Sequence, residues 1–188
     1  MKVNYVNCQQ THSSNVHIVK KKDVGKTIPN CDGLITNLKN ITLLIQTADC
    51  VPITLIDPVR KVVGVVHAGW RGSEKEIVKN AINLMINEFE SDKKDIKIKI
   101  GPAIDKDNFI VRNDVKNKFK DYEDYFEKIS EDQWKFDLVG VNIKQMLSLG
   151  ILEENIENSK ISTYLNKNYP SYRRDGITKG FETKIMLK

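Results

Sequence analysis

The sequence predicts a mixed α/β fold in which mixed β-sheet layers are packed by helices. Apolar runs of strand length are interspersed with amphipathic segments at helical spacing, which is typical of this fold class. No linker, internal repeat or low-complexity segment divides the 188 residues. A chain of this length can bury a sizeable core as one unit. We therefore expect residues 1–188 to form a single domain.

The first half of the chain is expected to supply mainly strands. The continuous apolar run Ile41–Ile45 has the pattern of a strand that is covered on both faces. A turn signal at Asp57-Pro58 separates two later apolar runs. The strands expected in this half are Val16–Val19, Leu34–Thr36, Ile41–Ile45, Val51–Ile56 and Lys61–Val66.

Helices enter in the second half. Ser73 and Glu76 match a capping box, which predicts a helix that begins at Ser73 and keeps one apolar face as far as Phe89. Residues 113–129 also have helical spacing of apolar side chains. A further helix is expected from an Asp137 cap to Leu149, because Gly150 follows it.

The remaining segments predict short strands and one loop. Asp95–Ile100 alternates apolar and polar residues, as a half-buried strand does. We expect a weaker strand over Ile156–Tyr164, a loop with a turn over Tyr172–Gly176, and a closing strand from Phe181 to Leu187.

The composition argues against several classes of protein. The net charge is +5, but the basic residues are dispersed and form no stripe with interleaved aromatics, so nucleic-acid binding is not expected. No apolar run approaches 18 residues, and the start lacks the apolar core of a signal peptide. Three cysteines at scattered spacings do not suggest a disulfide framework. We therefore expect a cytoplasmic protein without a membrane partner.

Three side chains are candidates for a metal site. Cys50 follows one apolar run, and His67 ends another, so both are held at strand ends. His12, in the polar segment QTHSSNV, is the best third ligand, whereas His17 lies within an apolar run and is expected to be structural. Two imidazoles and one thiolate suit zinc and leave a fourth position open. Their spacings match no short zinc signature, and Cys8 and Cys31 are expected to be structural.

The segment after His67 has the features of an anion site. Gly69 and Gly72 let the backbone approach a ligand, and Arg71 adds a fixed charge with several donors. The predicted helix start nearby would add free N–H groups. Arg173 and Arg174 could form an anion clamp or could be surface charges.

Two neighbouring side chains each have two open interpretations. Asp49 could cap a turn, or it could orient a histidine or a substrate amine as part of the catalytic group. Trp70 could belong to the core or stack on a base.

Several segments of the sequence resemble those of a known family. TADCVPITLIDP, HAGWRG, QTHSSNV, GPAI and SYRRDGIT are similar, in order and spacing, to segments of the bacterial laccase-domain family. That family is known as multicopper polyphenol oxidoreductases and as zinc-dependent purine nucleoside phosphorylases with adenosine deaminase activity. The similarity runs from about residue 8 to the end of the chain.

The resemblance implies a zinc bound by His12, Cys50 and His67. It also implies a nucleoside and phosphate as small-molecule partners. The first expected reaction is phosphorolysis of adenosine, inosine, guanosine or methylthioadenosine. The second is deamination of adenosine at C6. Copper is the less favoured metal, because multinuclear copper sites need more histidines than the three in this chain.

The sequence also departs from the family pattern. The family usually has further residues before its QVHG segment, so this chain is short at its N-terminus by comparison. The family's GPCCYEV segment is replaced by Asp105–Val111 without cysteines, and its TGR by Thr178–Gly180 without an arginine. We expect these changes to alter a substrate-binding wall and one anion contact.

Two further functions compete with the nucleoside enzyme. Cys50 could be the nucleophile of a thiol hydrolase, with His67 or His12 as its base. The chain could also be a non-catalytic, ligand-binding relative. Metal content, alkylation of the thiol and turnover assays distinguish these possibilities. The sequence does not predict the oligomeric state.

Overall fold

The hairpin that follows Cys50 lies at the centre of the structure, a computed structural model that describes residues 4–176 and 179–188. Strands β6 (Val51–Asp57) and β7 (Val62–Ala68) pair antiparallel, from Val51 opposite Ala68 to Asp57 opposite Val62. Asp57 accepts hydrogen bonds from the backbone N–H groups of Val59 and Arg60, which closes the connecting turn. The hairpin sets the register of the sheet around it.

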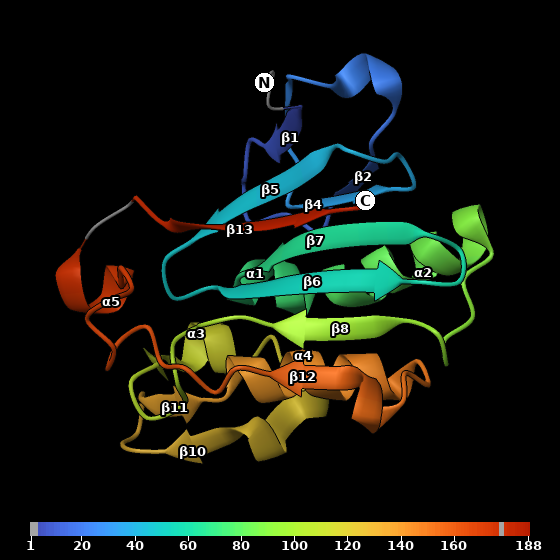
Figure 1. Cartoon of the computed structure of the whole chain (residues 1–188). Helices are drawn as coiled ribbons and strands as arrows, with labels where there is room; N and C mark the ends of the chain where they lie inside the picture. Colours follow the sequence, from blue (N-terminus) through green and yellow to red (C-terminus); the bar gives the residue numbers. More distant parts are fainter. Residues whose placement is uncertain (1–3, 177–178) are drawn as a thin grey trace.

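A six-stranded mixed sheet extends on both sides of this hairpin, in the order β12-β8-β6-β7-β4-β2 (Figure 1). β8 pairs antiparallel with β6, and β4 pairs antiparallel with β7, whereas the outer strands pair parallel with their neighbours. The four strands outside the hairpin are β2 (Val16–Ile18), β4 (Gly33–Thr36), β8 (Lys97–Ile100) and β12 (Ile156–Asn158).

A four-stranded sheet covers one face of the larger sheet and helices cover the other. The order of the smaller sheet is β13-β5-β1-β3, made of β1 (Tyr5–Cys8), β3 (Thr27–Ile28), β5 (Thr42–Thr47) and β13 (Phe181–Met186). On the opposite face lie α2 (Ile77–Phe89) and α4 (Leu138–Ser148) (Figure 1). The fold is therefore layered, with the β6–β7 hairpin in the middle layer.

Strand β7 is buried on both faces, and its alternate side chains belong to different cores. Val62, Val66 and Ala68 pack in the cluster that includes the helices. Val63 and Val65 pack in the cluster between the two sheets. Because strand side chains alternate, His67 projects on the side of Val63 and Val65, toward the four-stranded sheet.

The smaller elements complete the fold. A three-stranded sheet has the order β10-β11-β9. In it the rings of Phe126 and Phe136 are stacked, with their centroids 4.2 Å apart. The remaining elements are β9 (Ile110–Val111), β10 (Phe126–Lys128), β11 (Trp134–Phe136), α1 (Trp70–Glu74), α3 (Asn113–Lys116), α5 (Tyr172–Asp175) and the 3₁₀ turns η1 (Lys21–Asp23), η2 (Lys120–Tyr125) and η3 (Glu153–Asn155).

The predicted fold class is confirmed, and so are most elements of the central sheet. The helix after Asp137 is also confirmed: the Asp137 side chain accepts a hydrogen bond from the Gly140 N–H, and Gly150 has a φ of +89°. No helix in the described residues has the length and apolar character needed to cross a membrane.

Four predicted elements are wrong. The capping box fails because α1 begins at Trp70 and Glu76 adopts a left-handed conformation that breaks the chain before α2. Residues 113–129 contain α3, η2 and β10 instead of one helix. The strand over Ile156–Tyr164 ends at Asn158, and the loop over Tyr172–Gly176 contains α5.

The expectation that Ile41–Ile45 is covered on both faces is also wrong. β5 alternates between more and less buried residues, because only one of its faces packs on the large sheet. Its partners β13 and β1 belong to the same layer.

Candidate metal centre and the cavity around it

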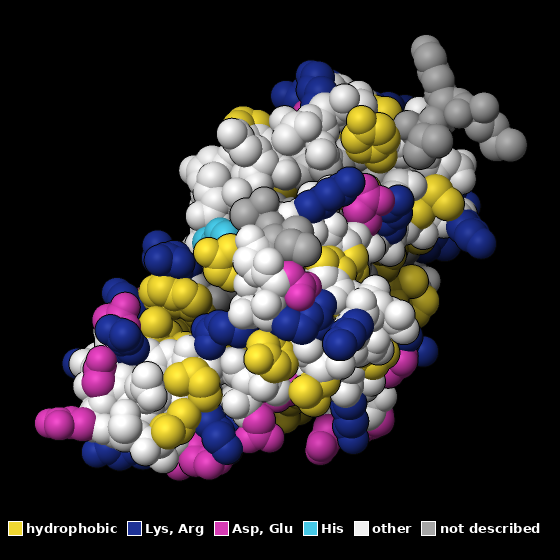
Figure 2. Space-filling view, turned by 90° about the vertical axis from the view of Figure 1, so that its left-hand side faces the viewer, with side chains coloured by type: hydrophobic (Ala, Val, Ile, Leu, Met, Phe, Trp, Pro, Cys, Tyr) yellow, Lys and Arg dark blue, Asp and Glu magenta, His cyan; other side chains and the backbone are white. Residues whose placement is uncertain are grey.

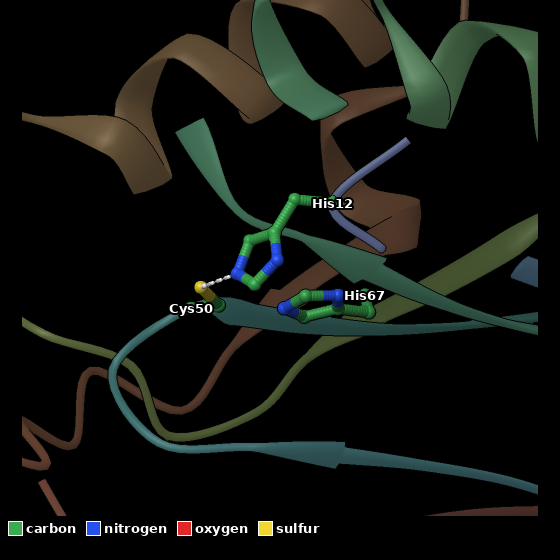
Figure 3. Close-up of side chains that lie close together, drawn as sticks. All are labelled: His12, Cys50 and His67. Carbon is green, nitrogen blue, oxygen red and sulfur yellow. Dashed lines mark hydrogen bonds between the residues drawn. The ribbon is translucent and has the colours of Figure 1, made fainter. Parts of the chain in front are cut away.

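Three side chains from distant parts of the sequence converge at one end of the sheet (Figure 3). The potential ligand atoms of His12, Cys50 and His67 all lie within 4.8 Å of one another. The Sγ atom of Cys50 is 3.9 Å from Nε2 of His12, and the two imidazole rings meet edge to face at 4.8 Å. The sequence predicted this convergence. The three side chains range from exposed at His12 to buried at His67, so the group is open on one side.

Strand register explains why these residues meet. Pro52 lies opposite His67, so Cys50 is placed just beyond the end of the hairpin that carries His67. The start of β4 pairs with the end of β7, and the start of β2 pairs with the start of β4. The loop before β2 therefore reaches the same edge of the sheet and brings His12 with it.

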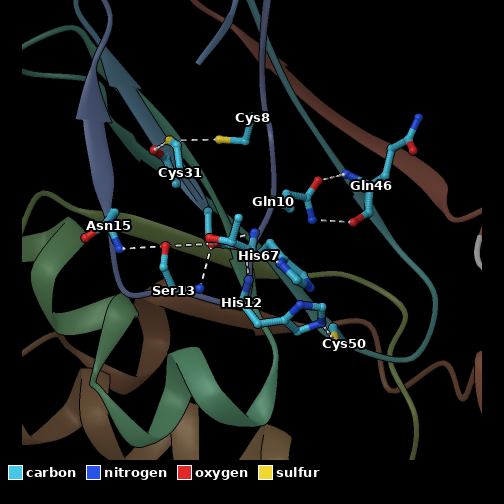
Figure 4. A network of polar contacts seen from close by, with 12 residues as sticks. Cys8, Gln10, His12, Ser13, Asn15, Cys31, Gln46, Cys50 and His67 are labelled. Carbon is cyan, nitrogen blue, oxygen red and sulfur yellow. Dashed lines mark hydrogen bonds and ion pairs between the residues drawn. The ribbon is translucent and has the colours of Figure 1, made fainter. Parts of the chain in front are cut away.

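A buried aspartate, Asp32, links two of the three side chains. Its carboxylate is fully buried and lies 2.8 Å from Nδ1 of His67. It also accepts hydrogen bonds from the backbone N–H groups of Thr11, His12 and Ser13, and from the Ser13 hydroxyl. Figure 4 shows His12, Ser13 and His67 close together beside Cys50. Because Nδ1 is engaged, Nε2 of His67 is the ring atom available to a ligand.

These contacts shift the pKa values of the group. Burial opposes ionisation of Cys50, but hydrogen bonds from His12 and His67 and their charges outweigh it and lower the thiol pKa to about 6. Burial likewise opposes the charge on His67, but Asp32 and Cys50 raise its pKa to about 9. Burial of Asp32 is outweighed by hydrogen bonds from His67 and Ser13, so its pKa falls to about 2. At neutral pH and without metal, these shifts favour a thiolate on Cys50 beside an imidazolium on His67.

Two glycines of the predicted anion loop have a steric role. A Cβ atom on Gly69 would lie 2.8 Å from Cδ2 of His12 and 3.0 Å from Sγ of Cys50. A Cβ atom on Gly72 would lie 2.9 Å from the carbonyl oxygen of Ser13. Both positions need glycine because α1 packs directly against the ligand-bearing segments. Their predicted role in binding phosphate stays a prediction.

The three side chains open into a cavity of about 660 Å³. On this face of the molecule, histidine surface lies beside hydrophobic and basic side chains (Figure 2). Two cationic side chains and several aromatic ones share the cavity wall. The residues that line it are Cys8, Gln10, His12, Gln46, Thr47, Ala48, Asp49, Cys50, His67, Trp70, Arg71, Ile104, Phe109, Leu138, Tyr172, Arg173 and Gly180.

The three predicted arginines have different surroundings. Arg71 is exposed, and its guanidinium stacks over Trp70 with the carbon 4.2 Å from the ring centroid. Arg173 donates to the carbonyl oxygens of Asn108 and Ile110 from one nitrogen and lies near Phe109. Both line the cavity.

Arg174 is outside the set of cavity-lining residues. Its guanidinium donates to the carbonyl oxygens of Thr163, Tyr164 and Tyr169, and it is paired with Asp175. These contacts fix the loop around α5.

Asp49, predicted as a catalytic residue, is buried and holds two other segments. One carboxylate oxygen accepts a hydrogen bond of 2.7 Å from the Thr163 hydroxyl, and the other accepts one of 2.6 Å from the Arg173 N–H. Its own carbonyl oxygen accepts from the Ile104 N–H. With a φ of 82°, Asp49 forms the tight turn that precedes Cys50. In this geometry its carboxylate supports the cavity wall.

The cysteines and the histidine expected to be structural lie outside the triad. Cys8 and Cys31 are buried with their sulfur atoms 3.0 Å apart, and Cys8 also borders the cavity. His17 is 3.1 Å from Asp23. In the segment that replaces GPCCYEV, Phe109 lines the cavity. Of the segment that replaces TGR, Thr178 lies outside the described residues, and Gly180 borders the cavity.

Asp32 and Tyr172 were not among the predicted site residues, and Phe109 was predicted only as part of a segment that alters a substrate-binding wall. The only signal for Asp32 was an acidic residue directly before an apolar run, which is also a common turn pattern. Phe109 and Tyr172 carry no periodicity that points to a cavity. They reach it because β9 and α5 approach the same edge of the large sheet.

The chain is similar in sequence to known proteins. The family model described as multi-copper polyphenol oxidoreductase laccase matches residues 1–188. A purine nucleoside phosphorylase of Rickettsia prowazekii is 35% identical to this chain, and the match covers 92% of this chain and 69% of that protein. A purine nucleoside phosphorylase of Bacillus subtilis is 31% identical, and the match covers 91% of this chain and 66% of that protein. The chain thus spans roughly two thirds of the length of these two relatives.

Solved structures of similar proteins have the same fold. A hypothetical protein of Bacillus licheniformis named YfiH has a TM-score of 0.95 at 31% identity, over 99% of this chain and 75% of that one. YlmD of Geobacillus stearothermophilus has a TM-score of 0.94 at 30% identity, over 99% and 74%. From the full-length family match and these relatives, the chain belongs to the multi-copper polyphenol oxidoreductase laccase family.

Proposed function

We propose that this chain is a zinc-dependent purine nucleoside enzyme that cleaves nucleosides with phosphate. The observation that carries the proposal is the convergence of His12, Cys50 and His67 at the wall of a cavity large enough for a nucleoside. The names of the Rickettsia prowazekii and Bacillus subtilis relatives supply the reaction class. The finer assignments, to adenosine, inosine or guanosine and to adenosine deamination, are part of the same proposal.

The donor set fits zinc. Imidazole nitrogen and thiolate sulfur are its usual ligands, and three protein ligands leave one position open. The lowered pKa of Cys50 keeps the thiol ionised at neutral pH, as a ligand must be. When bound, zinc would supply a Lewis acid that polarises an oxygen atom of a bound ligand. Three histidines in the whole chain favour zinc over a multinuclear copper site.

The cavity wall offers groups for both parts of the substrate. Arg71 and Arg173 present positive charge to the cavity, which suits the phosphate that attacks C1′ of the ribose. Phe109, Trp70 and Tyr172 provide apolar faces against which a purine could stack. In phosphorolysis the bond from C1′ to the base breaks, the base leaves, and ribose 1-phosphate forms. Asp49 contributes by fixing the backbone of Arg173.

A second candidate is a thiol hydrolase, because Cys50 and His67 have the charge state of an activated nucleophile and its partner. A thiol pKa of about 6 next to a protonated imidazole is typical of reactive cysteines. The position of His12 at 3.9 Å from the same sulfur argues for a metal, because a nucleophile needs only one base. A non-catalytic, ligand-binding relative is the third possibility.

The test combines elemental analysis with two assays on the same preparation. We expect about one zinc per chain, phosphate-dependent release of hypoxanthine from inosine, and conversion of adenosine to inosine. Cys8→Ala is the control variant. It should keep its zinc and both activities, because Cys8 borders the cavity without belonging to the triad. A zinc-loaded protein that releases no base in the presence of phosphate would contradict phosphorolysis. Activity of the metal-free protein that disappears on alkylation of Cys50 would favour the hydrolase.

A further inference from the structure

Asp32 forms hydrogen bonds with two of the three segments that carry the proposed metal ligands. It lies directly before β4, and its side chain is completely buried. One oxygen lies near His67 Nδ1 and accepts from the His12 N–H, while the other accepts from Ser13 and Thr11. An ionised carboxylate is stable there because each oxygen is surrounded by donors. No metal contact is needed to account for its burial.

The contact to His67 controls one ligand. Oδ1 of Asp32 is 2.8 Å from Nδ1, and the His67 N–H donates to the Asp32 carbonyl oxygen at 2.7 Å. Side chain and backbone are therefore both fixed by the same residue. A carboxylate on one ring nitrogen orients a ligating histidine and makes its other nitrogen a better donor to a metal.

The contact to His12 controls a second ligand in a different way. His12 has a φ of 58°, a left-handed conformation that is uncommon for residues other than glycine. Three consecutive N–H groups, of Thr11, His12 and Ser13, point to the Asp32 carboxylate at 3.1, 3.1 and 2.7 Å. The negative charge thus stabilises the turn that aims the His12 ring at Cys50.

We infer that Asp32 is a positioning residue for the metal centre, which fixes His67 through its ring and His12 through its backbone. Cys50 is independent of it, because the start of β6 and the Asp49 turn hold that residue. The inference rests on the metal site of the proposed function. It adds that two ligands separated by 55 positions depend on one carboxylate that lies outside the triad.

The test measures metal affinity in Asp32→Asn by competition with a chromophoric zinc chelator. The amide keeps the size of the side chain, but its NH₂ group cannot accept the hydrogen bonds from Ser13. We expect zinc affinity to fall by about 10- to 100-fold, as for other losses of a partner behind a metal ligand. In the cobalt-substituted protein, the thiolate charge-transfer band from Cys50 should persist while the ligand-field bands change.

Asp23→Asn is the matched control. Asp23 is also buried, lies 3.1 Å from a histidine ring, His17, and accepts a backbone hydrogen bond from Lys20. It lies outside the triad, so its loss should lower the melting temperature and leave zinc affinity unchanged. If Asp32→Asn does not fold, Ser13→Ala removes the hydroxyl that donates to Asp32 and accepts from the Asn15 N–H, and it should lower zinc affinity by a smaller factor.

The outcomes distinguish the inference from the proposed function. A wild-type protein that binds no zinc contradicts the proposed metal centre, and with it the inference. Zinc binding by the wild type that is equally tight in a folded Asp32→Asn, or in Ser13→Ala where Asp32→Asn does not fold, overturns the inference alone. A loss of zinc affinity equal to that of Asp23→Asn also overturns it, because the effect would then be one of general stability.

Discussion

Two groups of residues at the cavity are held by different buried aspartates. The first group, which we call the metal end, consists of His12, Cys50 and His67, and Asp32 holds the His67 ring and the His12 backbone. The second group, which we call the cationic end, consists of Arg71 and Arg173, and Asp49 holds the Arg173 backbone together with Thr163. Because the two aspartates hold different residues, metal binding and substrate binding should respond to different substitutions.

Cys50→Ala should have the largest effect at the metal end. Loss of one of three ligands weakens a catalytic metal site strongly, so we expect loss of bound zinc and of turnover. Cys31→Ala is the control, because Cys31 is a buried cysteine that does not belong to the triad. Zinc content by elemental analysis and the phosphorolysis rate are the measurements. Full zinc and full activity in Cys50→Ala would disprove the metal assignment.

Arg71→Ala tests the cationic end. Loss of a charge-assisted contact to phosphate should raise the phosphate KM by about tenfold or more. Zinc content should be normal, and deamination, which uses water, should suffer less than phosphorolysis. If Arg71 only supports the fold through Trp70, both reactions should fall equally and the melting temperature should drop. Both assays and a thermal melt on one variant separate these results.

Asp49→Asn should have an intermediate effect on the cationic end. The amide can accept from Thr163 but cannot accept from the Arg173 N–H with its NH₂ group. We expect a severalfold rise in KM for phosphate or nucleoside, with zinc affinity close to that of the wild type. Thr163→Val removes the other partner and serves as the comparison. A fall in zinc affinity as large as in Asp32→Asn would show that the two ends are not separable.

The smallest expected effect is a change in how the alkylation rate of Cys50 depends on pH. Because the thiol pKa of Cys50 is lowered to about 6, its thiolate forms as the pH rises through 6. The alkylation rate of the metal-free protein should rise through that pH and level off near neutrality, whereas an ordinary thiol with a pKa of about 8.5 continues to gain reactivity. Zinc should suppress the reaction. A midpoint near 8.5 would contradict the ion pair with His67.

The sequence predicted those parts of the molecule whose signals are local. The hairpin around Asp57-Pro58 was readable because apolar runs and turn chemistry occur side by side. The triad was predicted because Cys50 and His67 lie at the ends of such runs and His12 lies in a polar segment before another. Asp32 was missed because its role follows from the register between β2, β4 and β7, which no single segment encodes.

The segment over residues 113–129 illustrates why other elements were wrong. Phe119, Tyr122 and Phe126 have helical spacing, yet they lie in a 3₁₀ turn and a strand or beside them. The Phe119 ring packs against Tyr122, Phe126 and Phe136, and Phe126 stacks on Phe136. Their aromatic packing does not require a continuous helix. Likewise, Ser73 is not a cap, because its hydroxyl lies in the core and accepts a hydrogen bond from Asn142.

Strand β13 has a consequence for how the protein folds. It pairs antiparallel with β5 along its whole length, and Phe181 lies opposite Thr47, close to the turn that carries Cys50. Because Phe181 and Thr47 are far apart in the sequence, the pairing of β13 beside the Cys50 turn is a contact of high sequence separation, which forms slowly. During synthesis, β13 can pair with β5 beside the Cys50 turn only after β13 has left the ribosome. We therefore expect high zinc affinity only in the completely folded chain. Chain fragments that end before β13 should bind zinc weakly.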